Sequence, residues 1–359
     1  MRAPLLALFL LASCAKRDPD PAPTPPPPPA PSDAAVAVAV DAAPPDASGN
    51  QITIRAIEPR DPAQKAAAAR CSLDGDPLNG DYMKGPLTLA TSGPALYVSD
   101  GVTVRRYLRG PGDTCALVLD AKFGTAGVLT PPPREANPQV VGKGPVYLSS
   151  GADWKIAAGA GGAIYYVDFT RGIYRVDHGK AEPICPGLSG VGSLAVVGGK
   201  TFTDRDSGTV ALGGKCPTKA RVLSERVQEV FAVGDALYAA LDLEHVARFG
   251  KDNAIAARFG SEDTFKPGGL CAVAGVAACG DAICILDHNC PRIERFAPDG
   301  TFRDQLDDRA LFEQRVYGIS AMAAGPNGLW LAAVHKDGEV SEGAIYWLPL
   351  AAFAPAAPP

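Results

Sequence analysis

The stretch GDAICILD (280–287) combines a turn signal, a short apolar run and a closing aspartate. Gly-Asp followed by a run of apolar residues is typical of a β-hairpin turn that leads into a strand. The same form recurs in GPALYVSD (93–100), GGAIYYVD (161–168), GGKTFTDRD (198–206), GDALYAALD (234–242) and NGLWLAAV (327–334). Six copies of a turn followed by a strand predict a fold that is built from equivalent β units.

The spacing of these runs indicates what the units are. Successive runs are 68, 37, 36, 46 and 46 residues apart, counted from Ala95, Ala163, Lys200, Ala236, Ala282 and Gly328. Periods near 40 residues that contain strands alone are the signature of propeller blades. The first interval is longer because a proline-rich insertion, residues 130–150, lies inside it.

Further strands surround each run. A partner precedes it, as in EVFAV (229–233), and a third strand follows, as in VARFG (246–250). RFGKDNAIAARF (248–259) and RFAPDGTFRDQL (295–306) then supply a fourth strand. Four antiparallel strands in each of six blades predict an all-β, six-bladed β-propeller over residues 86–350. The alternative is an open or sandwich-like all-β domain, which would not require regular spacing.

The ends of the chain suggest how the last blade is completed. Residues 351–359, AAFAPAAPP, contain too much proline for a good strand, and we expect a disordered tail there. QITIRAI (51–57) alternates apolar and polar residues, which predicts a strand that closes the last blade beside residues 345–348. Segment 50–85 would then hold this closing strand and a short helix over PAQKAAAAR (62–70).

Two features of the repeats resemble the NHL-repeat type of propeller. One is the strand that ends in aspartate, and the other is an apolar-x-Arg-aromatic run before a polar turn, as in VARFGKDN (246–253) and IERFAPDG (293–300). The resemblance covers roughly residues 86 to 349. Two blades depart from it, because GTVALGGKCP (208–217) lacks the arginine and NGLWLAAV (327–334) lacks the aspartate.

The first residues indicate export. Arg2 precedes an apolar run, residues 3–11, which as a helix would be roughly 14 Å long and too short to span a membrane. Leu11-Ala12-Ser13-Cys14 resembles the lipobox of bacterial lipoproteins. The resemblance implies a signal peptide over residues 1–13, removed before Cys14, and a lipid on Cys14. The alternative is an ordinary signal peptide that happens to contain a cysteine.

The segment after this cysteine, residues 14–49, consists mostly of Pro, Ala and Asp. Some thirty such residues would reach roughly 100 Å as an extended stalk.

The net charge of −5 and the lack of a basic run argue against nucleic-acid binding. We therefore expect a monomer on the outer membrane, with its body in the periplasm or on the cell surface. It would bind a protein, peptide or glycan that the sequence does not identify.

Eight further cysteines in an exported chain predict disulfides, with zinc binding as the alternative. The stretch LCAVAGVAACGDAICILDHNC (270–290) predicts a hairpin with a two-residue turn at Gly280-Asp281. In such a hairpin Cys279 faces Ala282, and every other pair of facing residues has numbers that also sum to 561. Cys271 then faces Cys290, and Cys279 lies diagonally from Cys284. We predict these two bridges. A bulge at Gly275 would shift the register and prevent the first.

Charged residues also recur with the repeat. Third strands carry an arginine at one register, namely Arg106, Arg175, Arg248 and Arg295, and second strands end near Asp100, Asp168, Asp242 and Asp287. Because the pattern repeats with the blade, we predict Arg–Asp pairs that serve the fold, and expect Arg248 and Arg295 to contact aspartates. The alternative is a charged ring around the propeller mouth.

Candidate metal ligands cluster near the loops that follow the second strands. His245, His288 and His335 fall there, and Asp168, Asp287, His288 and His335 could surround a metal. No pair of histidines has ligand spacing, so we predict that they are exposed loop residues and not metal ligands. No Ser-His-Asp pattern, nucleophile elbow or phosphate-binding glycine loop stands out, and we therefore predict no catalytic residue and no cofactor.

Two functions remain open. The first is a binding or interaction scaffold, to which the long loop 124–150 could add a lid or contact surface. The second is a calcium-dependent enzyme of the six-bladed lactonase or esterase sort, by analogy of fold alone. Three or more Asp, Glu, Asn or His side chains that converge on the central channel would favour the enzyme.

Overall fold

In a computed structural model of the protein, contacts divide the chain into two units, residues 1–58 and residues 59–359. Every residue that the structure describes belongs to the second unit. For residues 168, 205, 208–213, 216–222, 335–337 and 340–342 it describes the backbone alone. The described ranges are 65–75, 88–100, 103–110, 115–130, 155–159, 163–168, 172–177, 180–186, 188, 191–205, 208–213, 216–222, 226–242, 244–250, 254–261, 263–264, 266–313, 316, 318–337 and 340–353. None of the helices in these ranges has the length and apolar character needed to cross a membrane.

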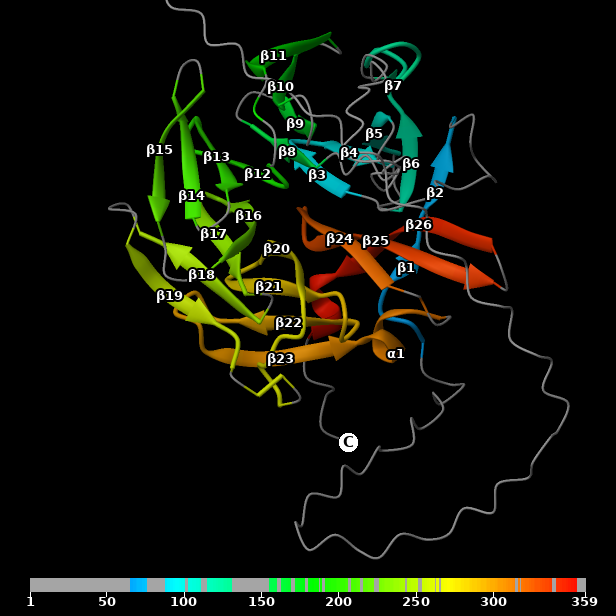
Figure 1. Cartoon of the computed structure of the whole chain (residues 1–359). Coiled ribbons are helices and arrows are strands. Elements are labelled where there is room, and N and C mark those ends of the chain that lie inside the picture. The colour runs from blue at the N-terminus through cyan, green and yellow to red at the C-terminus, as the bar shows by residue number, and fades with distance from the viewer. Residues whose placement is uncertain are drawn as a thin grey trace, which may run out of the picture. The chain divides into compact units, whose positions relative to one another are not determined.

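The described residues form six sheets, which we number along the chain (Figure 1). The first contains β3 (Thr88–Ser92), β4 (Ala95–Ser99), β5 (Val104–Arg109) and β6 (Ala116–Leu119), joined by β2 (Ser72–Asp74) and β7 (Val128–Leu129). The second contains β8 (Ile156–Ala158), β9 (Ile164–Asp168), β10 (Gly172–Asp177) and β11 (Lys180–Pro186). The third contains β12 (Leu194–Val197), β13 (Lys200–Arg205), β14 (Gly208–Gly213) and β15 (Cys216–Val222).

The remaining sheets follow the same order of strands. The fourth contains β16 (Val227–Val233), β17 (Ala236–Leu241), β18 (His245–Phe249) and β19 (Ile255–Phe259). The fifth contains β20 (Val273–Cys279), β21 (Ala282–Asp287), β22 (Arg292–Phe296) and β23 (Phe302–Asp307). The sixth contains β24 (Gly318–Gly325), β25 (Gly328–Asp337), β26 (Val340–Pro349) and β1 (Ala69–Arg70). A short helix, α1 (Asp308–Leu311), connects the fifth sheet to the sixth.

The first strands of the sheets lie beside one another around a centre. β3, β8, β12, β16, β20 and β24 contact one another in this order, and β24 also contacts β3. Hydrophobic clusters fill the spaces between neighbouring sheets; for example, Tyr97 of the first sheet packs with Tyr166 of the second, and Leu96 packs with Trp330 of the sixth. Sheets that pack face to face around a common centre form a β-propeller. The propeller prediction is therefore confirmed.

The blades are less uniform than the repeat predicts. Five of the described sheets have four strands, whereas the first sheet has six, because β2 and β7 join it. β2 runs parallel to β6, although every other strand pair is antiparallel. The expectation of six equal four-stranded blades is thus wrong for the first sheet. The reason is that a segment from before the repeats adds to its outer edge.

That segment, residues 67–74, contacts α1 and joins the last sheet to the first. The backbone N–H groups of Ala67 and Ala68 donate to carbonyls of α1 at 2.9 Å. β1 then pairs with β26, with Ala69 opposite Trp347 and Arg70 opposite Tyr346. After Cys71, the chain enters β2 at Ser72, on the edge of the first sheet. The segment therefore covers the outer edge of the last sheet and crosses to the first.

An N-terminal strand does complete the last sheet, but the residues differ from those expected. The predicted strand, residues 51–57, lies outside the described residues, and β1 occupies the position beside Tyr346 and Trp347. The expected helix over residues 62–70 is wrong in its described part, because no residue from 65 to 70 is helical. Four alanines favour a helix only weakly, and edge pairing with β26 outweighs that preference.

The C-terminal segment begins with structure. Leu350–Phe353 forms the 3₁₀ helix η2, within the region expected to be a tail. Arg295 holds this helix, because its Nη2 donates to the Phe353 carbonyl at 3.2 Å and its guanidinium lies 5.0 Å from the Phe353 ring centre. Residues 354–359 lie outside the described part of the chain.

Disulfides join the cysteine pairs that the hairpin register selects, Cys271–Cys290 and Cys279–Cys284, with Cα–Cα distances of 5.8 and 5.7 Å. Gly280 has a φ of 65° in the two-residue turn, and Cys279 faces Ala282 as predicted. The register does shift between Val273 and Gly275, yet the first bridge forms. Both of its cysteines lie beyond the strand ends, where the backbone can adjust.

Two other cysteine sites are also oxidised. Cys71 is bonded to Cys115, which lies just before β6, with a Cα–Cα distance of 4.5 Å. Cys185 is disulfide-bonded as well.

Candidate functional site

The aspartates that end the second strands have a structural role in two sheets. Asp287 accepts N–H bonds from Cys271 and Ala272 at 2.8 and 3.0 Å. Asp204 accepts N–H bonds from Ser193 and Gly192 at 2.6 and 3.1 Å. Each carboxylate thus binds the backbone just before the first strand of its own sheet. This explains why a strand that ends in aspartate recurs.

Of the four predicted metal ligands, the structure describes the side chains of Asp287 and His288. Asp287 is fully buried and bonded as above, and Nδ1 of His288 lies 2.9 Å from the carbonyl oxygen of Ile319. The side chains of Asp168 and His335 lie outside the described part of the structure. Ligand atoms of Cys271, Asp287 and Cys290 do gather within 4.8 Å, but both sulfurs belong to one disulfide.

Three of the four repeated arginines contact aspartates, but not those at the ends of the second strands. Arg106 pairs with Asp120, and Nε of Arg295 donates to Asp304 at 2.8 Å. Both aspartates lie on or just after the fourth strand of the same sheet. The contact expected of Arg295 is therefore confirmed, whereas the assignment of partners from the second strand is wrong.

Arg248 departs from the expectation altogether, because its Nη1 donates to the Pro298 carbonyl at 2.9 Å. Arg175 reaches Asp177 at 3.5 Å, with both side chains exposed.

Strand register explains the error. Asp287 faces Arg292 at the start of β22, whereas Arg295 faces Cys284, three residues along. Three residues of strand span about 10 Å, which is too far for a direct pair. The arginine nearest the strand end takes the aspartate instead: Arg292 lies 3.3 Å from Asp287, and Arg105 lies 2.6 Å from Asp100.

A buried charged cluster extends from this pair. Nε of Arg292 lies 2.9 Å from Oε1 of Glu294, and its Nη2 donates to the Thr264 carbonyl at 3.0 Å. Glu294 is fully buried, and neither of its oxygens accepts a hydrogen bond from the described residues. Burial raises the pKa of Glu294 to about 7, and the charge of Asp287 adds to this, although Arg292 opposes it.

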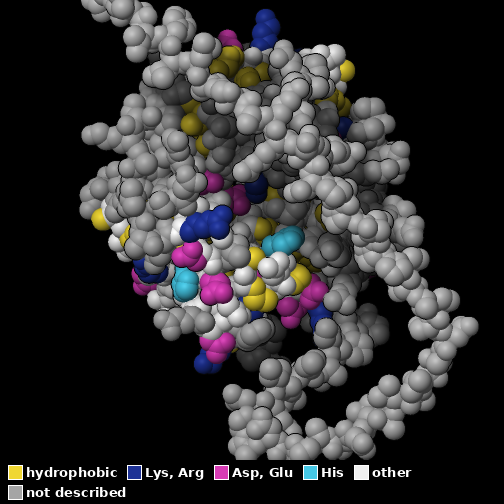
Figure 2. All heavy atoms as spheres, in the orientation of Figure 1, with side chains coloured by type: hydrophobic (Ala, Val, Ile, Leu, Met, Phe, Trp, Pro, Cys, Tyr) yellow, Lys and Arg dark blue, Asp and Glu magenta, His cyan; other side chains and the backbone are white. Residues whose placement is uncertain are grey.

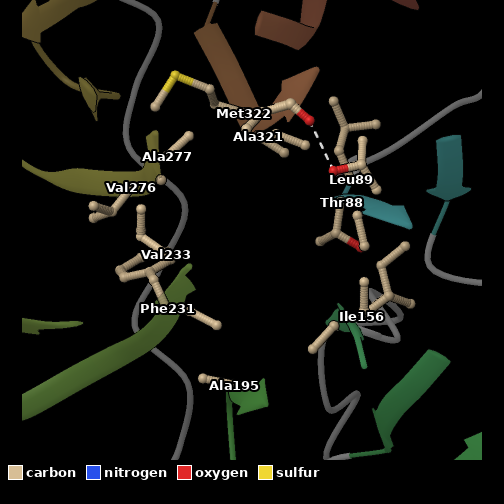
Figure 3. A pocket seen from close by; sticks show the side chains of 18 of the residues that line it. Thr88, Leu89, Ile156, Ala195, Phe231, Val233, Val276, Ala277, Ala321 and Met322 are labelled. Atoms are coloured by element: carbon tan, nitrogen blue, oxygen red, sulfur yellow. Dashed lines mark hydrogen bonds between the residues drawn. The ribbon is translucent and has the colours of Figure 1, made fainter. Parts of the chain in front are cut away.

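The first strands of the sheets surround a central cavity of about 320 Å³. Residues from β3, β8, β12, β16, β20 and β24 line it, so every sheet contributes. Figure 3 shows Phe231, Val233 and Val276 on one side of this space and Leu89 and Ile156 on the other. The wall is mostly apolar and rich in alanine, which keeps the centre open. A volume of this size falls in the range of small-molecule sites.

One ion pair lies in the cavity wall. Nζ of Lys155 is 2.9 Å from Oε1 of Glu229, and the two side chains are 29% and 19% exposed. They are the charged residues among the described ones that line the cavity. Burial raises the pKa of Glu229, while Lys155 lowers it and the charge of Asp204 raises it further. Burial also raises the pKa of Asp204, against the effect of its hydrogen bonds.

The surface around these elements carries mixed charge. On the face shown in Figure 2, coloured acidic and basic side chains lie next to one another, with apolar side chains between them. No large patch of one sign is visible among the described side chains on that face. The central cavity is the candidate site that we consider further.

Comparisons with known proteins give the fold and no more. No family model and no curated protein matches the sequence. A protein of unknown function from Bacteroides thetaiotaomicron VPI-5482 has a similar structure, with a TM-score of 0.50 at 12% identity; the match covers 78% of this chain and 75% of that one. The chain is a β-propeller. The WD40 propeller domain of Doa1 is also similar, with a TM-score of 0.44 at 9% identity over 72% of this chain and 78% of that one.

Sequence reasoning missed Lys155 and Glu229 as a pair. They lie 74 positions apart and belong to no motif. One signal was available: both fall at the starts of first strands, which in a propeller meet at the same end of the central channel.

Proposed function

We propose that this chain is an exported lipoprotein, anchored by a lipid on Cys14, whose propeller binds a small ligand in the central cavity. The observation that carries the proposal is the cavity itself, which every sheet lines and which small side chains leave open. A rigid ring of first strands would hold such a ligand without large rearrangement. The outer membrane is the proposed location, with the propeller in the periplasm or on the cell surface.

Disulfide bonding supports the export part of the proposal. Three pairs, Cys71–Cys115, Cys271–Cys290 and Cys279–Cys284, are bonded in the described part of the chain. Disulfides persist in oxidising compartments and are rare in the cytosol. Two of the pairs lie within one hairpin, and the third joins distant segments. We propose that all three stabilise a fold that works outside the cytoplasm.

A binding role has more support than the calcium-dependent enzyme. Calcium sites use six to eight oxygen ligands, mostly carboxylates and carbonyls. Glu229 is the one carboxylate among the described residues that line the cavity, and Lys155 pairs with it. One carboxylate paired with a lysine is better suited to orient a ligand in an apolar site than to coordinate a metal ion.

The finer description of the fold is also part of the proposal. We propose that the first sheet acts as a sixth blade despite its added strands. The similarity to NHL-repeat propellers has support from the arginine-aromatic pairs, since Phe249 and Phe296 are buried and Arg295 contacts an aspartate.

A fragment screen with a cavity-filled variant tests the binding function. Thermal shift against a library of small molecules should find compounds that raise the Tm of the protein. Ala232 lines the cavity and is exposed, so Ala232→Phe should fill the space without disturbing the core and should abolish these shifts. Ala256 on β19 is exposed too but does not line the cavity, and Ala256→Phe should leave the shifts unchanged. A library with no hits, or hits that survive Ala232→Phe, would argue against the proposed function.

The anchor has a separate test. Cells that express the full chain should incorporate a labelled fatty acid into it, and the mature protein should partition into detergent. Cys14→Ala should remove both properties, while the neighbouring Ala15→Ser should keep them. Membrane retention and labelling of Cys14→Ala would show that the lipid assignment is wrong.

A further inference from the structure

The charges at the cavity are unbalanced. Lys155 carries one positive charge, whereas Glu229 in the wall and Asp204 close behind it supply two carboxyl groups. Asp204 is 9% exposed and its oxygens accept hydrogen bonds from Ser193 and Gly192. Lys155 therefore neutralises at most one of the two carboxylates. Burial is the main cause of the raised pKa of both acids, and the charge of Asp204 raises the pKa of Glu229 further.

One oxygen of Glu229 is available to a ligand. Lys155 contacts Oε1, and Oε2 accepts no hydrogen bond from any residue that the structure describes. The Glu229 side chain is 19% exposed. A cation that enters the cavity would therefore meet a carboxylate oxygen that is partly desolvated and still able to accept a hydrogen bond.

An aromatic ring lies next to this carboxylate along the strand. Glu229 and Phe231 are two positions apart on β16, beyond the register shift, so they project to the same side of the strand. Both line the cavity, and Phe231 is only partly buried. A carboxylate and an aromatic side chain in one cavity wall are a combination that suits an organic ammonium group.

The opposite end of the cavity is mostly apolar; Thr91 is its polar residue on β3, and its hydroxyl donates to the Ala324 carbonyl at 2.8 Å. The first strands all end in turns to the second strands, and the lining residues there include Ala232, Ala278 and Ala324. Ala158 and Val196 occupy the corresponding places on β8 and β12. The cavity thus has a charged end at Glu229 and an apolar end at the turns.

We infer that the cavity binds a small organic cation, an ammonium with an apolar alkyl or aryl group, whose nitrogen lies at Glu229 and whose apolar part extends toward the turn end. This inference rests on the proposed function and specifies its ligand class. Both a carboxylate ligand and a neutral ligand fit the charges less well. A carboxylate would lie close to Glu229, with Asp204 behind it, and a neutral molecule would bring no positive charge to Glu229.

Three probes of one shape test the inference: 3-phenylpropylammonium, 3-phenylpropanol and 3-phenylpropionate, titrated into the full propeller by calorimetry. The ammonium should bind at least tenfold more tightly than the alcohol, and the carboxylate should bind weakest. Glu229→Gln should weaken ammonium binding about tenfold and leave alcohol binding within twofold. Lys155→Met removes a competing cation and should strengthen ammonium binding.

Controls separate this inference from the proposed function. Each variant is first checked for folding by circular dichroism, and if Glu229→Gln does not fold, Glu229→Asp, which keeps the charge, should retain the preference for ammonium. Ala232→Phe should abolish binding of the ammonium. Tightest binding of the carboxylate, or equal binding of all three probes, would overturn the cation inference while the binding function stands. No binding of any probe, or ammonium binding that survives Ala232→Phe, would also overturn it; the fragment screen decides the binding function independently.

Discussion

Cys71 is bonded to Cys115 across the seam where the propeller closes. Cys71 lies between β1, which pairs with the last sheet, and β2, which pairs with the first. Its own N–H donates to the Ile345 carbonyl at 2.9 Å, so the backbone and the disulfide hold the same point. The disulfide thus fixes to the first sheet a segment whose backbone is hydrogen-bonded to the last sheet.

This bond should contribute more to stability than the bond inside the fifth sheet. Its cysteines are 44 positions apart, whereas Cys279 and Cys284 are five apart. Loop-closure entropy gives about 4 kcal/mol for the longer loop and about 2 kcal/mol for the shorter one. Urea unfolding of the two double Cys→Ser variants measures the difference. Equal losses, or a larger loss for the short loop, would contradict the role of the seam.

Truncation tests the same segment without touching a disulfide elsewhere. A chain that begins at residue 65 keeps β1 and β2, and we expect its Tm to match that of the chain from residue 50. A chain that begins at residue 76 exposes the edges at Tyr346 and Ala116, and its Tm should fall by several degrees. If the loss of residues 50–64 already lowered the Tm by as much, the closing strand would lie upstream of β1.

Glu294 makes stability depend on pH near neutrality. Its pKa in the folded protein is about 7, above the ordinary value of 4.5, so the folded state binds this proton more tightly than the unfolded state. The stabilising effect of the proton is complete below pH 4.5 and disappears as the pH rises through 7. Between pH 5 and 8, wild type should lose up to about 3 kcal/mol more than Glu294→Gln, which does not titrate.

Urea melts at both pH values provide this measurement. Glu313 is exposed, and Glu313→Gln serves as the matched control, with the same pH dependence as wild type. Parallel curves for wild type and Glu294→Gln would show that the buried carboxyl does not titrate in this range.

The hydrogen bonds that aspartates near the ends of the second strands accept should matter for stability. Asp204→Asn keeps the size of the side chain but weakens the acceptors for Ser193 and Gly192, and we expect a loss of about 2 kcal/mol. The exposed Asp235→Asn should cost little. Thermal melts compare the two. A stable Asp204→Asn variant would show that these hydrogen bonds are not needed to hold the start of β12.

The parts of the fold that were predictable are those with a local signal. Gly280 marks its turn, and the turn fixes the register that brings Cys279 opposite Ala282 and Cys271 near Cys290. Strand identity in each sheet follows from the same period of turns and apolar residues. Such signals act over fewer than ten residues, which is why they can be read from the chain directly.

The parts that were missed depend on pairing between distant segments. β1 has two residues, and nothing in Ala69–Arg70 marks a strand until β26 is beside it. The partner of Arg295 was missed for a related reason. The prediction considered the aspartate on the second strand, whereas Asp304 on the fourth strand lies closer to Arg295. The pairing of Lys155 with Glu229 could not be predicted locally, because the two residues meet only when the ring of sheets is closed.

The central claim, that the cavity is a ligand site for an organic cation, is tested most directly by methyl NMR. Protein labelled with ¹³C at alanine methyls reports on the cavity wall, since Ala90, Ala157, Ala195, Ala232, Ala277 and Ala323 line it from different sheets. We predict that 3-phenylpropylammonium shifts these methyls together in wild type, and does so about tenfold less readily in Glu229→Gln. Shifts confined to alanines outside the cavity, or no shifts at millimolar probe, would contradict the account.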